Sequence, residues 1–550
     1  MGGTAGRSQN NNAARRPHQP TRAARPCPPV RAAHPRRQPS GPATPTPSTP
    51  AEESASSTAT LAVAAPDGFL GRAFVTALQP GPARFYLSWL PGAGAALGLL
   101  GAVHAHDAVH AGLAAVPPSW LAALPASASV GDLYAAHPAL LDGAVDSAAG
   151  LVNLLLLFVL VPAADALFGR EPEAELPPAT AGPPPPAAGG LLRKASALAA
   201  STPGHPPVAA AAARAADAAA DAAFDAYRVP LWGVGAIHLA LLAAGATLVA
   251  PAANPVATLA AACGVGAWGG MVFTVMHELL HSPHPVERRL ADFLLSTYGY
   301  AHWRDGHLAH HRNVGTPGDP ATARLGESLF EFMPRCVVGN VRDAVAAAEG
   351  RALGRARRAA IAAGEDPDSK AVKAAGAAGA AATAAGWVAA PASLAILAGS
   401  VGGPAAVAFW AVQAVVGIYM LHSVDYIEHY GLVRAELPAG GQGVDSAATT
   451  APAKTKRYEK VAPHDSWNAN FMATNAITFR LQRHSDHHAH AERAYHKLRD
   501  VGAGEASYLP MSYPAMMILA QSPPLWRAVM DPHVERARAR AAAVRAGKSE

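Results

Sequence analysis

Lysine and arginine are absent from three long stretches of the 550-residue chain, and this constrains the fold more than any other feature. The stretches are residues 85–169, 229–287 and 374–433. Each is mostly apolar and long enough for two helices of about 20 residues with a short turn, the length that crosses a bilayer. We therefore predict three transmembrane hairpins and an integral, multi-pass membrane protein surrounded by lipid.

The predicted fold is all-α, a bundle of six transmembrane helices. The spans lie near residues 86–105, 148–167, 231–250, 256–276, 376–399 and 404–424. Every lysine and arginine falls on the side of the N-terminus, which the positive-inside rule assigns to one membrane face. Only 15% of the residues are charged, against about 25% in soluble proteins. A soluble, alanine-rich helical bundle is the alternative.

Composition divides the chain into five regions. Residues 1–65 form a tail rich in Arg, Pro, Ala and Ser that is either disordered or a transit peptide. A transit peptide would direct the protein to a plastid or mitochondrial membrane. The other regions are the first hairpin (84–170), a low-complexity insertion (171–225), a transmembrane and histidine-rich catalytic region (226–535) and a basic tail (536–550). The net charge of +5 comes with no basic helix interleaved with aromatics, so nucleic-acid binding is not expected.

Histidines gather in three clusters and one single position, each following a predicted span. They are His277 and His281; His307, His310 and His311; His484, His487 and His488; and the single His429. Spacings of three and four residues place side chains on one helix face. The topology places all four groups on the same membrane face, the N-terminal side, where they can converge on a metal site.

Nine histidines are more than one zinc ion can use, so the number suits two metals. Imidazole binds Fe, Cu, Ni and Zn well. Three acidic residues beside the clusters are candidates for orienting the imidazoles: Glu278, Glu428 and Asp486. Two alternatives remain open at this point. His277, Glu278 and His281 alone match a zinc protease signature, and a histidine-rich metal transporter would also need many imidazoles.

Several motifs resemble the membrane alkane 1-monooxygenase family, within the wider fatty-acid desaturase-like superfamily. They begin at Leu481 (Leu-Gln-Arg-His-Ser-Asp-His-His-Ala), Tyr426 (Tyr-Ile-Glu-His-Tyr-Gly-Leu) and Asp165 (Asp-Ala-Leu-Phe-Gly). The resemblance covers residues 84–170 and 226–535. One departure concerns the second cluster, where Gly306 replaces the family's usual Glu and one residue is missing after His307.

The resemblance implies a di-iron centre held by all nine histidines, with O2 as co-substrate. The implied reaction is terminal hydroxylation of a medium or long alkyl chain, alkane to 1-alkanol. Electrons would come from a separate rubredoxin- or ferredoxin-type carrier, because the three cysteines form no Cys-x-x-Cys pair. An acyl-lipid desaturase or fatty-acid hydroxylase that uses the same centre is the alternative enzyme.

Overall fold

The computed structural model describes residues 82–100, 148, 151–171, 226–250, 255–437, 444–445 and 456–547. All of them belong to the larger of two units of the chain, Thr60–Glu550. The expected tail at 1–65, and the expected insertion apart from its first residue, Glu171, lie outside the described residues.

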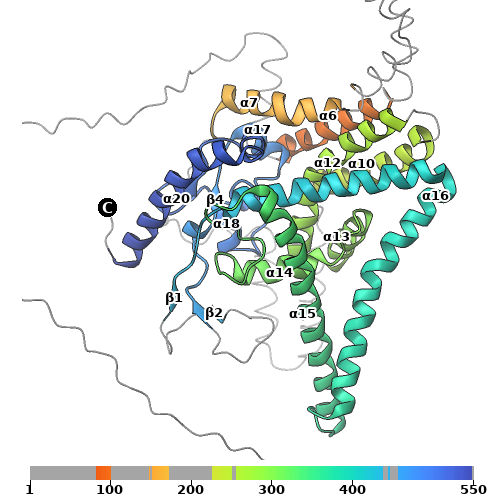
Figure 1. Ribbon diagram of the computed structural model, residues 1–550, viewed down its shortest axis with the longest axis vertical. Coiled ribbons are helices and arrows are strands. Elements are labelled where there is room, and N and C mark those ends of the chain that lie inside the picture. The colour runs from red at the N-terminus through yellow and green to blue at the C-terminus, as the bar shows by residue number, and fades with distance from the viewer. Residues whose placement is uncertain are drawn as a thin grey trace, which may run out of the picture. The chain divides into compact units, whose positions relative to one another are not determined.

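Helices form most of the described structure (Figure 1). The apolar ones are η1 (Pro82–Trp89), α6 (Val152–Leu155), η2 (Leu156–Leu160), α7 (Val161–Phe168), α10 (Arg228–Ala244), η3 (Gly245–Val249), α12 (Pro255–His281) and α16 (Lys370–His429). The remainder are α13 (Pro285–Thr297), α14 (Trp303–Asn313), α15 (Leu329–Ala363), η4 (Pro463–Asp465), α17 (Met472–Ile477), α18 (His484–Ala489), η5 (Tyr495–Lys497), α19 (Tyr513–Ala520) and α20 (Pro523–Arg545).

Three helices among the described residues are long and apolar enough to cross a membrane: Arg228–Val249, Pro255–His281 and Lys370–His429. The third is two helical segments that meet at Gly403, whose positive φ of 66° is outside the helical region. Pro404 then begins the second segment, because proline is well suited to the first turn of a helix. The break falls between the spans expected at 376–399 and 404–424. Val152–Phe168 is a shorter apolar helix.

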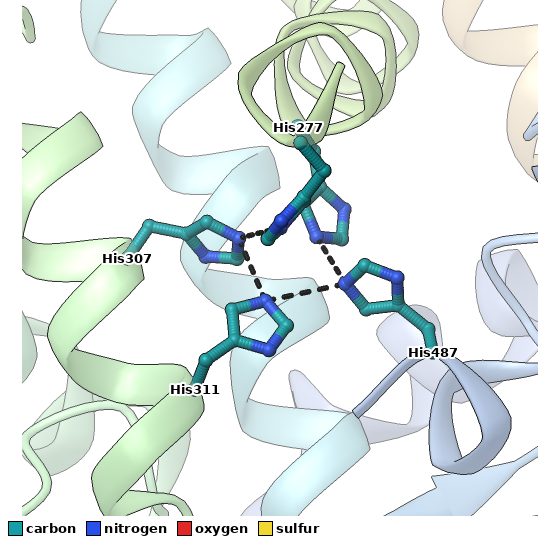
Figure 2. A group of neighbouring side chains, drawn as sticks. His277, His307, His311 and His487 are labelled. Atoms are coloured by element: carbon teal, nitrogen blue, oxygen red, sulfur yellow. Dashed lines mark hydrogen bonds between the residues drawn. The ribbon is translucent and has the colours of Figure 1, made fainter. Parts of the chain in front are cut away.

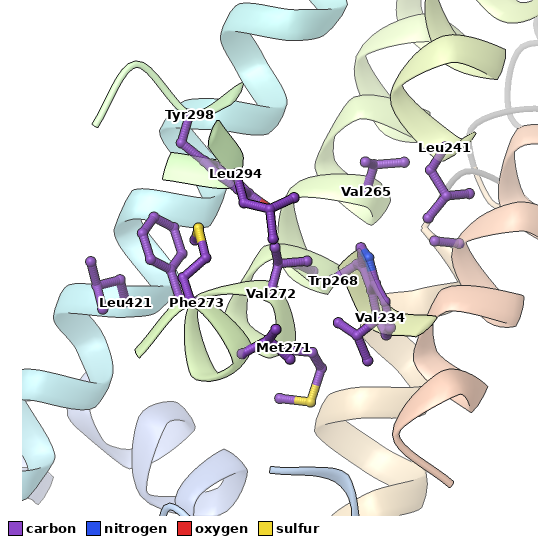
Figure 3. Close-up of a cluster of buried hydrophobic side chains, with 14 of the residues drawn as sticks. Val234, Leu241, Val265, Trp268, Met271, Val272, Phe273, Leu294, Tyr298 and Leu421 are labelled. Atoms are coloured by element: carbon purple, nitrogen blue, oxygen red, sulfur yellow. The ribbon is translucent and has the colours of Figure 1, made fainter. Parts of the chain in front are cut away.

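α12 is the central helix of the hydrophobic core (Figure 3). Its Trp268 and Val272 side chains are fully buried against residues of α10 and α13. α12 also packs along α16, and this contact depends on small residues. A Cβ atom added to Gly269 would lie 2.9 Å from the Cα atom of Gly417. Close backbone approach through glycine is the usual means of packing membrane helices, and here it brings the C-terminal ends of both helices to one place.

Two small sheets complete the structure. In the first, β3 (Arg457–Tyr458) pairs antiparallel with β1 (Glu436–Leu437) and with β2 (Val444–Asp445). In the second, β4 (Trp467–Asn468) pairs parallel with β5 (Ser507–Tyr508). The backbone N–H of Ser485 donates to the side chain of Asn468, which follows Trp467 in β4. The second sheet therefore supports the start of α18.

α15 and the first segment of α16 pack together and form the long pair of helices in Figure 1. Ser328 and Glu331 cap the start of α15 with a reciprocal capping box. Gly364, with φ 73°, ends α15 in the left-handed conformation. The arginine-rich residues 345–373 form the end of α15, a short turn and the start of α16.

Candidate metal centre

Four segments deliver the nine histidines to one place. α12 carries His277 and His281 near its C-terminal end, and α16 ends on His429. α14 and α18 are short helices that carry three histidines each. The nine imidazoles form two groups, and within each group the candidate ligand atoms all lie within 4.8 Å of one another. One group contains His277, His281, His307, His311 and His487; the other contains His310, His429, His484 and His488.

Helix periodicity explains how one cluster serves two groups. Residues four apart stay on the same side of a helix, so His307 and His311 enter the first group together. His310, three residues after His307, belongs to the second group. In α18, His484 and His488 are four residues apart and share the second group, whereas His487 enters the first.

The first group is a chain of close nitrogen contacts (Figure 2). The Nε2 atom of His487 lies 2.7 Å from that of His277 and 3.2 Å from that of His311. The Nε2 atom of His307 lies 3.0 Å from those of both His311 and His281. In Figure 2 the rings of His277, His307, His311 and His487 point toward one another from three different elements.

These contacts fit a shared cation better than hydrogen bonds. A ring nitrogen has one hydrogen or one lone pair, yet the Nε2 atoms of His307, His311 and His487 each face two others. Two imidazole nitrogens bound at about 2.1 Å to one ion, at right angles to each other, would be separated by about 3.0 Å. The observed separations of 2.7 to 3.2 Å agree with that value.

The second group is also arranged for a cation. The Nε2 atoms of His429 and His484 lie 3.1 Å apart. Both ring nitrogens of His488 are buried with no hydrogen-bond partner in the part of the chain that the structure describes. Buried polar atoms are rarely left unpaired, so His488 fits a ligand. The ring centres of His311 and His488, one from each group, are 4.5 Å apart, which makes the two groups direct neighbours.

Burial keeps most of these imidazoles neutral. It lowers the pKa of His307, His311 and His487 well below the usual value, and repulsion from neighbouring histidines adds to this effect. Neutral imidazole has the free lone pair that binds a metal. His310 differs, because burial would lower its pKa but the carboxylate of Asp319 outweighs burial and raises it.

Two carboxylates contact the second group. Asp319 Oδ2 lies 2.8 Å from Nδ1 of His310, which orients the ring and leaves Nε2 for an ion. Glu428 Oε2 lies 3.3 Å from Nε2 of His484, the atom that faces His429. Glu428 therefore lies on the ligand side of the ring, where it can act on a bound ion directly.

The other two acidic candidates, Asp486 and Glu278, contact groups other than the imidazoles. Asp486 forms ion pairs with Arg493 and Arg499, so its carboxylate ties α18 to the following loop. Glu278 accepts a hydrogen bond from the backbone N–H of Tyr495, 3.1 Å away. Among the described residues, neither carboxylate is hydrogen-bonded to an imidazole, because each points to the segment after α18.

A buried network positions α18. Phe479 and Arg480 have positive φ values of 53° and 55°, which are costly for residues with a Cβ atom. Arg480 Nη2 lies 2.6 Å from Glu171 Oε1, and Arg84 Nη1 lies 2.8 Å from the same oxygen. Arg483, immediately before His484, lies 3.3 Å from it. Glu171 thus connects the first hairpin to the third histidine cluster.

A small cavity adjoins both histidine groups. Phe273, Thr274, Leu421 and Val424 line it together with His277, His307, His310 and His484. A second small pocket reaches the first group at His281 and is lined by polar residues that include Glu287 and Arg493. The centre therefore has one mostly apolar approach and one polar approach.

Close helix packing at Gly306 accompanies the shortened second histidine cluster, His307–His311. A Cβ atom at this position would lie 3.0 Å from Oδ1 and 3.2 Å from the carbonyl oxygen of Asn340 in α15. α15 thus packs closely where the related family usually has Glu. The histidines of α14 nevertheless enter both groups.

One further set of metal-binding residue types was not found from the sequence. Cys336, His422 and Asp425 form a third, buried group. The sequence could have indicated this group through the spacing of His422 and Asp425, which puts both on one helix face. His422 also lies two turns before His429. His302, by contrast, belongs to none of the three groups, and its ring packs on Tyr300 and Trp387.

Comparison with known proteins gives consistent matches. The fatty acid desaturase family model matches residues 252–520. The alkane 1-monooxygenase of Pseudomonas putida is 34% identical over 277 residues, which cover 50% of this chain and 60% of that protein. Alkane 1-monooxygenase 1 of Alcanivorax borkumensis is 36% identical, with coverage of 50% and 60%. The alkane 1-monooxygenase of Ectopseudomonas oleovorans is 33% identical over 316 residues, with coverage of 56% and 68%. The chain thus spans about three fifths of the first two relatives.

Proposed function

The chain belongs to the alkane 1-monooxygenase family, and on that premise we propose that it hydroxylates the terminal carbon of a medium or long alkyl chain with O2. The observation that carries this proposal is the pair of neighbouring histidine groups beside a mostly apolar cavity. One group has five imidazoles and the other has four, and most of them are neutral. This number and type of ligand suits two iron ions, one in each group. His277, His281, His307, His311 and His487 would hold one, and His310, His429, His484 and His488 the other.

When bound, the two iron ions supply O2 activation and removal of hydrogen from an unactivated C–H bond. The protein's own contribution is to bind and position. Phe273, Leu421 and Val424 line the cavity with apolar surface, which would bind the end of an alkyl chain and exclude water. His277 and His484, one from each group, line the same cavity. A chain end in the cavity would therefore lie beside both ions.

We place the site on the membrane face that carries the N-terminus, and we retain six spans. Three apolar helices of sufficient length, one of them divided at Gly403, support this topology. The histidines at the ends of α12 and α16 support the shared face, because both helices end at the site.

The electron donor is a separate small iron protein of rubredoxin or ferredoxin type. The polar pocket at His281 supports electron entry there, because it brings the first histidine group close to the aqueous surface. Arg289 is exposed in the neighbouring helix α13, where a positive charge would attract an acidic carrier. Replacing Arg288 and Arg289 by Gln should raise the KM for the carrier, and unchanged carrier-supported turnover would reject this docking surface.

A fatty-acid desaturase or hydroxylase is the second candidate, supported by the desaturase family model over residues 252–520. The protease and transporter alternatives gain no support. Glu278 accepts a hydrogen bond from the backbone of Tyr495, and the nine histidines are gathered in two groups rather than spread along a membrane path.

Product analysis tests the proposal. The full-length chain, loaded with iron and supplied with a reduced carrier, is given alkanes and fatty acids in parallel. We expect 1-alkanols from the alkanes, with one oxygen atom from labelled O2. A double bond in the fatty acid without any alkanol would instead establish the desaturase.

A further inference from the structure

Cys336, His422 and Asp425 form a compact group outside the nine-histidine centre. Cys336 comes from α15, and the other two residues come from the second segment of α16. The Nδ1 atom of His422 lies 2.9 Å from Oδ2 of Asp425 and 3.4 Å from Sγ of Cys336. Cys336 and His422 are fully buried, and the Asp425 side chain is 13% exposed.

The sulfur of Cys336 and the Nδ1 atom of His422 have close to the spacing that a single tetrahedral ion requires. A tetrahedral ion that binds a thiolate at about 2.3 Å and an imidazole at about 2.1 Å separates S and N by about 3.6 Å. The observed separation is 3.4 Å. A hydrogen on Nδ1 can serve only one acceptor well, yet this atom faces both a carboxylate and a sulfur.

Neighbouring side chains contact His422 and Cys336 in the way that the residues around a metal site contact its ligands. The other ring nitrogen of His422, Nε2, lies 2.7 Å from the hydroxyl of Tyr300, which can accept its hydrogen. Histidines that bind metals typically donate their second N–H in this manner. Asn340 Nδ2 donates to the Cys336 sulfur at 3.5 Å, a contact that stabilises a thiolate.

We propose that Cys336, His422 and Asp425 bind a third metal ion, a divalent ion of the zinc class, with a water molecule as fourth ligand. The thiolate selects this class, because soft sulfur donors favour zinc over the harder ions. The nine-histidine centre contains no sulfur, so the two sites differ in chemistry.

The third ion would connect α15 to α16 beside the catalytic cavity. Asp425 also lines that cavity, so an ion bound to it would fix this part of the cavity wall. Its role would be to hold the two helices together and to position Asp425. The inference stands independently of the substrate that the enzyme uses.

Metal analysis of the full-length chain in detergent tests the proposal. We expect about one zinc ion per chain in addition to iron. Cys336→Ser should lose the zinc and retain the iron, and Asp425→Asn should bind zinc more weakly. Cys263→Ser is the matched control, because Cys263 lies in α12 outside all three groups. Failure of the nine-histidine site would instead appear as loss of iron.

The spectrum of the cobalt-loaded wild type provides a readout that does not depend on any variant folding. Bound to a thiolate, Co2+ gives a near-ultraviolet charge-transfer band that histidine-only sites cannot give. We expect this band in the cobalt-loaded wild type and in Cys263→Ser, and its loss in Cys336→Ser. A wild type without the band, or a Cys336→Ser variant that keeps both the band and the zinc, would overturn the proposal and leave a hydrogen-bonded trio with a neutral thiol.

Discussion

The Nε2 atoms of His277 and His487 lie 2.7 Å apart although 210 residues separate them in the sequence. His277 lies near the end of a membrane-length helix, and His487 lies in a short helix that the buried Glu171 network supports. No single histidine cluster supplies a complete group. Metal binding therefore depends on the fold that joins α12, α14, α16 and α18.

Removing His487 should affect the first group selectively. We expect His487→Ala to bind about one iron ion per chain instead of about two, because one of five ligands is lost. Alkane hydroxylation should fall to background. The measurement is iron content together with product yield. His302→Gln is the control, because His302 is a partly buried histidine that belongs to neither group; equal iron loss in both variants would contradict the assignment.

Asp319 should act on metal affinity through His310. Asp319→Asn keeps the size of the side chain but removes the charge next to His310 Nδ1. We expect the affinity for iron in the second group to fall about 10- to 100-fold, the usual effect of losing such a partner. Titration of the iron-free chain with Fe2+ measures it. Unchanged affinity at both sites would show that Asp319 does not support the ligand.

Glu171 should contribute stability that depends on pH. Burial would raise its pKa, but Arg483, Arg480 and Arg84 outweigh burial and lower it. Because the pKa of Glu171 is lower in the folded chain than in the unfolded chain, where it is about 4.3, ionised Glu171 stabilises the fold at pH values above about 4.3. That stability is lost as the pH falls through the pKa of the folded state. We expect Glu171→Gln to cost about 3 kcal/mol near pH 7.

Thermal unfolding of both proteins across a pH series measures this contribution. The difference in Tm between wild type and Glu171→Gln should be largest above about pH 5 and should narrow below about pH 4. Glu436→Gln is the control, because Glu436 pairs with Lys456 on the surface and such pairs contribute little. A difference in Tm that stays constant with pH would exclude an ionised Glu171 as the source.

Val424 should limit the length of the bound alkyl chain. It lines the cavity, and a larger side chain there removes space. We expect Val424→Phe to shift turnover toward shorter alkanes while iron content stays the same. Val415→Phe is the control on the same helix, because Val415 is 66% exposed. Competition among alkanes of different length measures the shift, and identical product profiles would place the alkyl chain elsewhere.

The sequence predicted part of this site for clear physical reasons. Spacings of three and four residues showed that His307, His310 and His311 share a helix, and charge distribution indicated a common membrane face. The division of these histidines between two groups was not predictable, because it depends on the relative rotation of four separate helices. Asp319 and Glu171 were also missed as supporting residues, since their partners are distant in sequence or on another element.

The most direct test of the central claim is the metal content and spectrum of the purified, full-length, iron-loaded chain. Two neighbouring histidine groups predict about two iron ions per chain, and Mössbauer spectra should show two ferrous sites with nitrogen ligands. Substitution of His487 should remove one of these sites and substitution of His484 the other. A single iron or zinc ion per chain, lost equally with either histidine, would contradict the two-group arrangement.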